Sequence, residues 1–177
     1  MLTYTDVWRS LTPAERGRAC GAFLSSTDEL SKQVRPAVLT ALAGALRFRE
    51  KFLKTQPDAK KAEWLASRSN HPDLRRHHDS LLRAWLLTEQ GGMIEHFLEV
   101  QGIPHAGCML DGEPPPPSAE SLQKGIAAIR EKSGDRCCAL YLAFLLAEGD
   151  TGFWGALPAA VEAAGLRLQE AMAVAAG

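Results

Sequence analysis

The chain has 177 residues, close to the length of one domain, with 46% hydrophobic and 23% charged residues, which is typical of globular rather than disordered proteins. Its net charge of −1 gives no global field that favours binding to nucleic acid or anionic lipid. The longest uninterrupted apolar run, residues 137–147, is shorter than the roughly 20 residues that cross a bilayer. The first residues lack the basic start and apolar core of a signal peptide. We therefore expect a soluble, cytoplasmic protein without membrane contact.

The composition also indicates the fold class. The sequence has 24 Leu and 27 Ala but only 6 Val and 4 Ile. Leu and Ala lose little entropy in helices, whereas β-branched residues favour strands. We therefore predict an all-α fold, a single irregular bundle of seven to nine helices. It forms one domain over 1–177, with sub-regions 1–101 and 118–177 joined by a Pro/Gly-rich loop at 102–117.

Helix start signals recur in the first third of the chain. The motif Thr-Pro-Ala-Glu at 12–15 is a capping box with proline at the first helical position, and it predicts a helix over 13–25. The motif Ser-Thr-Asp-Glu at 26–29 repeats the pattern and predicts a short helix over 28–35, which Pro36 kinks into a longer one over 36–55. Pro57 starts a further short helix.

The rest of the chain is expected to alternate between helices and breaks. Residues 71–90 have helical apolar spacing, and a short helix follows over 93–101. The loop 102–117 holds three glycines and five prolines, and its four consecutive prolines favour a stiff polyproline II spacer. Helices are predicted over 119–132 and 136–148, separated at Gly134, and Pro158 is expected to kink the last helical region.

The charges are unevenly distributed between the two halves. Residues 1–89 carry 15 basic and 10 acidic side chains, a net +5, whereas residues 90–177 carry 5 and 11, a net −6. Such asymmetry can mark a partner-binding surface. It can also mean that the two halves attract one another, within one chain or across a dimer, and we favour this second interpretation.

Enzymatic motifs are absent from the sequence. The chain has no H-E-x-x-H, no G-x-S-x-G, no phosphate-binding glycine loop and no C-x-x-C among its four cysteines. The reverse of a di-iron motif, His96-x-x-Glu99, occurs once. We therefore predict no catalytic residues, no metal site and no cofactor. His105 and Cys108, close together in the glycine-containing loop, are the candidate ligand-binding residues.

Nucleic-acid binding would depend on the basic first half. Arg47, Lys51 and Lys54 fall on one side of the expected 36–55 helix, where they could contact phosphates. The apolar stripes of these helices are needed for a core, however, so a solvated basic face is the favoured interpretation.

No motif identifies a family. The leading hypothesis is a non-enzymatic helical protein that acts through protein–protein contacts and self-associates as a homodimer. The first alternative is an enzyme or small-molecule binder that uses the loop 102–111. The second is a regulator that binds nucleic acid through the basic first half.

Overall fold

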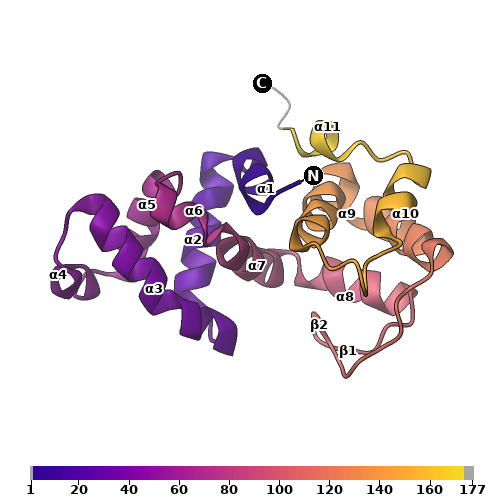
Figure 1. The fold of residues 1–177 in the computed structure, drawn as a ribbon, viewed down its shortest axis with the longest axis horizontal. Helices are drawn as coiled ribbons and strands as arrows, with labels where there is room; N and C mark the ends of the chain where they lie inside the picture. The colour runs from indigo at the N-terminus through magenta and orange to yellow at the C-terminus, as the bar shows by residue number, and fades with distance from the viewer. Residues whose placement is uncertain (1, 174–177) are drawn as a thin grey trace. The chain divides into compact units, whose positions relative to one another are not determined.

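The structure, a computed structural model, describes residues 2–173 and is predominantly helical (Figure 1). The expected all-α class is confirmed. The elements in chain order are α1 (Tyr4–Ser10), α2 (Pro13–Ser25), α3 (Glu29–Leu46), α4 (Glu50–Lys54), α5 (Asp58–Arg68), α6 (Pro72–Arg75), α7 (His78–Glu89), α8 (Gly91–Val100), β1 (His105–Ala106), β2 (Met109–Leu110), α9 (Ala119–Glu148), α10 (Leu157–Ala163) and α11 (Leu168–Met172).

The described part of the chain has eleven helices rather than seven to nine. Several of the additional helices are single turns that carry too few residues to show a period. The first helix, α1, does have a start signal, because Thr3 and Asp6 exchange hydrogen bonds as in a capping box. Aspartate replaces the usual glutamate in this box, which conceals the pattern.

The chain divides into two compact units. Unit 2 comprises residues 11–88, and unit 1 comprises the residues up to Ser10 together with those from Glu89 onward. These boundaries differ from the expected sub-regions 1–101 and 118–177, and the single-domain organisation over 1–177 stays a prediction. Residues 1 and 174–177, at the two ends of that expected domain, lie outside the described residues.

Unit 2 is built around α2, which packs on α5, and α3, which packs on α4, α5 and α6. The predicted capping box at the start of α2 is confirmed, with Thr12 and Glu15 satisfying each other's backbone N–H groups. Phe23 and Leu65 are fully buried. His78 is also buried, and its Nε2 lies 2.9 Å from the Ser69 carbonyl oxygen, as in a satisfied core histidine.

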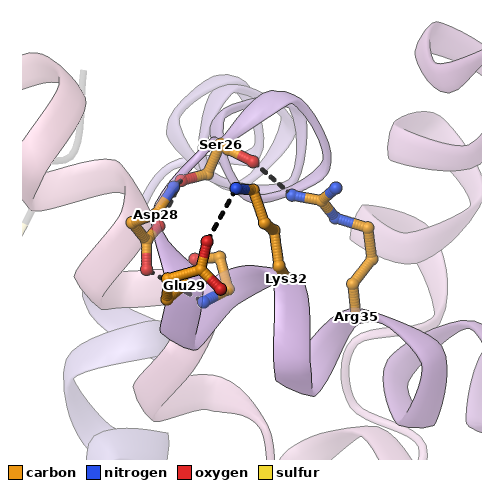
Figure 2. Close-up of polar contacts among 6 residues, drawn as sticks. Ser26, Asp28, Glu29, Lys32 and Arg35 are labelled. Atoms are coloured by element: carbon orange, nitrogen blue, oxygen red, sulfur yellow. Dashed lines mark hydrogen bonds and ion pairs between the residues drawn. The ribbon is translucent and has the colours of Figure 1, made fainter.

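The corner between α2 and α3 is closed by polar side chains (Figure 2). Arg35 of α3 donates to the carbonyl oxygens of Phe23 and Ser26, which α2 leaves unsatisfied at its end. Asp28 caps α3, because its Oδ1 accepts from the backbone N–H of Ser31 at 2.9 Å and its other oxygen accepts from the Ser26 hydroxyl. The corner therefore satisfies both helix ends with side chains.

The course of α3 corrects two expectations. Pro36 does not interrupt the helix, which runs through it from Glu29 to Leu46. Proline removes one backbone donor, but its φ suits a helix, and the buried Val38 and Leu42 beyond it favour continuation. The helix then ends at Leu46 rather than near residue 55, because Arg47 adopts a left-handed conformation.

Unit 1 is built around the long helix α9, on which α1, α8, α10 and α11 pack. The Phe97 ring of α8 lies 5.4 Å from that of Tyr141 and 6.1 Å from that of Trp154. Gly125 permits this packing, because a Cβ there would lie 2.9 Å from the Phe97 ring. Pro158, expected to kink the last helical region, lies instead in the first turn of α10, where its missing N–H costs no bond.

The expected break at Gly134 is a kink inside α9, with φ 80° and ψ 164°, a conformation that is essentially restricted to glycine. Arg130 spans the kink. Its guanidinium forms two bonds with the Asp135 carboxylate, at 2.9 and 3.0 Å, and a third with the Ala164 carbonyl oxygen at 2.9 Å. One side chain therefore links both parts of α9 with the end of α10.

Candidate functional site

The charges segregate by compact unit more strongly than by half of the sequence. Unit 2 carries 14 basic and 8 acidic side chains, a net +6, whereas unit 1 carries 6 and 13, a net −7. The residues 89–123 contain six carboxylates and no Lys or Arg. Each unit therefore has a field of its own sign, which favours partners of the opposite sign.

The most distinctive surface of unit 2 begins where α3 ends. Arg47, at φ 56° and ψ 36°, is the only non-glycine residue with positive φ in the described chain. The N–H of Phe48 donates to the Ala43 carbonyl oxygen at 2.9 Å, and that of Arg47 to the Gly44 oxygen at 3.1 Å, which is a Schellman motif. Arginine occupies the position that glycine normally takes, at a conformational cost.

This turn brings three aromatic rings together. The ring of Phe48 lies 5.2 Å from that of Phe52 and 5.3 Å from that of Trp64, at interplanar angles of 85° and 73°. Phe48 and Phe52 are nevertheless 38% and 48% exposed, whereas the neighbouring Leu53 is buried and anchors α4. Edge-to-face pairs of this kind fix the rings relative to one another. The result is an ordered apolar patch in which both phenylalanine rings are partly exposed.

Basic residues neighbour the two phenylalanines of this patch in the chain. Arg47, Arg49, Lys51 and Lys54 are exposed and form no side-chain hydrogen bond or ion pair within residues 2–173, with Glu50 the one carboxylate among them. The two lysines of α5 are different, because each is paired with a carboxylate. Lys60 pairs with Glu63 at 2.8 Å, and its Nζ lies 5.4 Å from the Trp64 ring centroid; Lys61 pairs with Asp58 at 2.7 Å.

We call this area the basic aromatic surface; it comprises Arg47, Phe48, Arg49, Lys51, Phe52, Lys54 and Trp64. Sequence reasoning found its cations but placed Arg47, Lys51 and Lys54 on one face of a continuous helix. It missed Phe48 and Phe52, because nothing at position 47 resembles a helix stop. The signal available was that an uninterrupted 36–55 helix would contain two aromatic residues beside four cations.

The other candidate, the loop 102–117, contains a small hairpin in which His105 pairs with Leu110 and Ala106 with Met109. The Nδ1 atom of His105 lies 2.5 Å from the Gly107 carbonyl oxygen, and the Cys108 thiol donates to the Gly91 carbonyl oxygen at 3.4 Å. The two side chains thus bond to different carbonyl groups rather than to each other.

The environment of Cys108 does not activate its thiol. Burial and the nearby Glu95 carboxylate raise the pKa of Cys108, so the protonated form is favoured at neutral pH. A nucleophilic cysteine requires the opposite shift. The ligand-binding role of His105 and Cys108 stays a prediction.

Unit 1 also contains an apolar cavity of about 340 Å³, whose lining includes Leu145, Trp154 and Pro158. Asp150 also lines the cavity. The Oδ1 atom of its carboxylate accepts hydrogen bonds from the backbone N–H groups of Gly152 and Phe153, at 2.9 and 3.1 Å. Small-molecule sites combine an apolar wall with convergent polar groups. In this cavity the Asp150 carboxylate is engaged in capping a turn.

Residues 2–173 lack two features that would indicate particular classes of function. They contain no group of three or more His, Cys, Asp or Glu side chains arranged to hold a metal ion. No helix among them has the length and apolar character needed to cross a membrane.

Comparison with known proteins adds no relative to this description. The chain matches no protein-family model, no curated protein and no solved structure at the level at which relatedness is inferred.

Proposed function

We propose that the chain is a non-enzymatic protein that acts through protein–protein contacts, and that its basic aromatic surface binds an acidic segment of a protein partner. The observation that carries this proposal is the combination of four unpaired exposed cations with two exposed phenylalanine rings. The cations attract and orient an anionic partner, and the rings supply the apolar contact area that dominates interface energies.

Nucleic acid, the second alternative, would use the same cations, because lysine and arginine bind phosphates. The aromatic geometry favours a protein. The bases of a single strand stack on the faces of aromatic rings. The rings of Phe48, Phe52 and Trp64 instead meet edge to face and form an uneven apolar surface. An uneven surface of this kind suits aliphatic side chains and prolines better than flat bases.

The first alternative, an enzyme or small-molecule binder based on His105 and Cys108, has weaker support, since a raised thiol pKa opposes nucleophilic chemistry. The cytoplasmic location and homodimeric assembly expected from the sequence belong to the main proposal. All four cysteines are free, which supports a reducing compartment.

The test is a binding titration with two fluorescent probes. One is a twelve-residue peptide of glutamate, leucine and proline; the other is a single-stranded oligothymidine. The full chain is expected to bind the peptide at 50 mM salt and to lose about tenfold in affinity at 300 mM, because salt screens exposed charges. Phe52→Ala and Lys51→Glu should each weaken binding about fivefold or more.

Arg68→Glu is the matched control, since Arg68 is an exposed, unpaired cation of unit 2 outside the basic aromatic surface. It changes the charge of the unit by the same amount as Lys51→Glu and should affect peptide affinity less than twofold. Equal effects of the two reversals, or no peptide binding at low salt, would overturn the proposal. Tighter binding of the oligothymidine would replace it with the nucleic-acid alternative.

A further inference from the structure

The hairpin after α8 presents apolar side chains outward. Ile103 is buried, with its N–H donating to the Leu98 carbonyl oxygen at 3.0 Å, and the Cys108 thiol bonds to Gly91, so both sides of the hairpin are fixed to α8. Met109 and Leu110 are nevertheless 48% and 40% exposed. Unit 1 therefore carries an ordered, exposed apolar pair.

The residues after this pair are acidic and rich in proline. Asp111 and Glu113 are exposed, and four prolines follow at 114–117. The first and last of these prolines are half-buried and the middle two are exposed. This spacing of three matches the period of a polyproline II helix, which keeps one edge against the protein and turns the others outward.

We call residues 109–117 the acidic proline segment; its chemistry complements that of the basic aromatic surface. Polyproline II segments bind to aromatic-lined surfaces, because their conformation is already fixed and little entropy is lost on binding. The two carboxylates match the unpaired cations at 47–54, and Met109 and Leu110 match the exposed phenylalanine rings. Each chain thus contains both an aromatic, cationic surface and a segment of the kind that such surfaces bind.

We infer that the partner of the basic aromatic surface is a second copy of this chain, which docks its acidic proline segment there. The inference rests on the proposed function of that surface and names its occupant. Charge complementarity carries it, since the unit that holds the surface is net +6 and the unit that holds the segment is net −7. Every copy supplies both binding elements, so association needs no other protein.

The test uses full chains with reversed charges on one element at a time. The surface variant carries Lys51→Glu and Lys54→Glu, and the segment variant carries Asp111→Lys and Glu113→Lys. All four side chains are exposed, so both variants should retain the helicity and melting temperature of the native chain, which circular dichroism checks. The native chain is expected to associate to at least the mass of a dimer in light scattering, about tenfold more weakly at 500 than at 50 mM salt.

Each variant alone should be monomeric, because like charges then face each other. An equimolar mixture should associate again, since the reversed surface of one chain matches the reversed segment of the other. Met109→Ser should weaken native association about fivefold without changing its salt dependence. A native chain that stays monomeric at every salt concentration overturns the inference, as does a mixture that fails to associate.

The matched control carries Glu131→Lys and Glu162→Lys, which change the charge of unit 1 as much as the segment variant but lie on α9 and α10. It should associate like the native chain, and dissociation would refute a role specific to the segment. The proposed function is contradicted by a different result, the absence of binding to the acidic peptide probe at low salt. If the native chain binds the acidic peptide probe but does not self-associate, the surface binds another protein. This inference and the homodimeric assembly are then wrong, while the proposed binding of an acidic segment holds.

Discussion

Units 1 and 2 are both built mainly from helices but are stabilised in different ways. In unit 2, side chains cap the starts of two adjacent helices, Thr12 at α2 and Asp28 at α3. Unit 1 uses one long helix whose backbone must kink at Gly134 and approach a neighbour closely at Gly125. It follows that the corner of unit 2 at Asp28 is sensitive to protonation, whereas the long helix of unit 1 is sensitive to a single methyl group added at Gly125 or Gly134.

The largest expected effect tests the dependence of unit 1 on its backbone. Gly134→Ala should lower the free energy of unfolding by about 1–3 kcal/mol, because φ 80° with ψ 164° excludes side chains. The position is open, with no atom within 4 Å of an added Cβ, so the loss reports the backbone alone. Urea denaturation measures it.

Gly17→Ala is the control in unit 2, where Gly17 lies within α2 and an added Cβ also meets open space. This substitution should stabilise the chain by about 0.5–1 kcal/mol, because alanine loses less entropy in a helix. If both substitutions shifted stability in the same direction, the contrast between the units would be lost.

The next effect tests the sensitivity of unit 2 to pH. Partial burial works to raise the pKa of Asp28, but hydrogen bonds from Ser26 and Ser31 outweigh it and lower the pKa to about 2, from 3.8. A lowered carboxyl pKa means that the stabilisation is complete above pH 3.8 and is lost as the pH falls towards 2. Since the group is partly exposed, we expect a contribution of about 1 kcal/mol.

Asp28→Asn keeps a capping oxygen but cannot ionise. The native chain should exceed this variant in stability by about 1 kcal/mol at pH 7 and by almost nothing at pH 2, as measured by urea denaturation at both values. Glu29→Gln, which removes the exposed partner of Lys32, is the control and should change stability by less than about 0.5 kcal/mol at either pH. If the difference in stability between the native chain and Asp28→Asn did not depend on pH, the lowered pKa of Asp28 would be contradicted.

The smallest effect on stability is expected at Arg47, in the basic aromatic surface. Arg47→Gly should raise the free energy of unfolding by about 0.5–1 kcal/mol, because glycine adopts the left-handed conformation without strain. The same substitution should weaken binding of the acidic peptide probe, since it removes one of four unpaired cations. Arg49→Gly, in an extended conformation, should weaken binding without stabilising the chain. Equal stability changes in the two variants would show that the cap is unstrained.

Much of the fold could be predicted from the sequence, and the failures have physical causes. Capping motifs and proline located the starts of α2, α3 and α9 within a residue, because these signals are local. The continuation of α3 through Pro36 could not be predicted, since it depends on tertiary packing. The end of α3 could not be predicted either, since an arginine occupies the position usually taken by glycine.

The candidate site, like the fold, could be predicted only in part. Its cations were visible as a run of basic residues, whereas its rings were assigned to no surface, because their exposure depends on the turn at Arg47. The opposite charges of the two halves were visible in the sequence. Their alignment with compact units required the structure, which places α1 and Glu89 with the acidic residues.

The bonds of Arg130 have a consequence for how unit 1 opens. One guanidinium connects both parts of α9 with the carbonyl group of Ala164, so the end of α10 cannot detach while the kink stays intact without breaking a charged hydrogen bond. The amide protons beside Gly134 and those at the end of α10 should therefore exchange with solvent in one concerted opening. The kink and α10 then act as a single cooperative element, joined by one arginine.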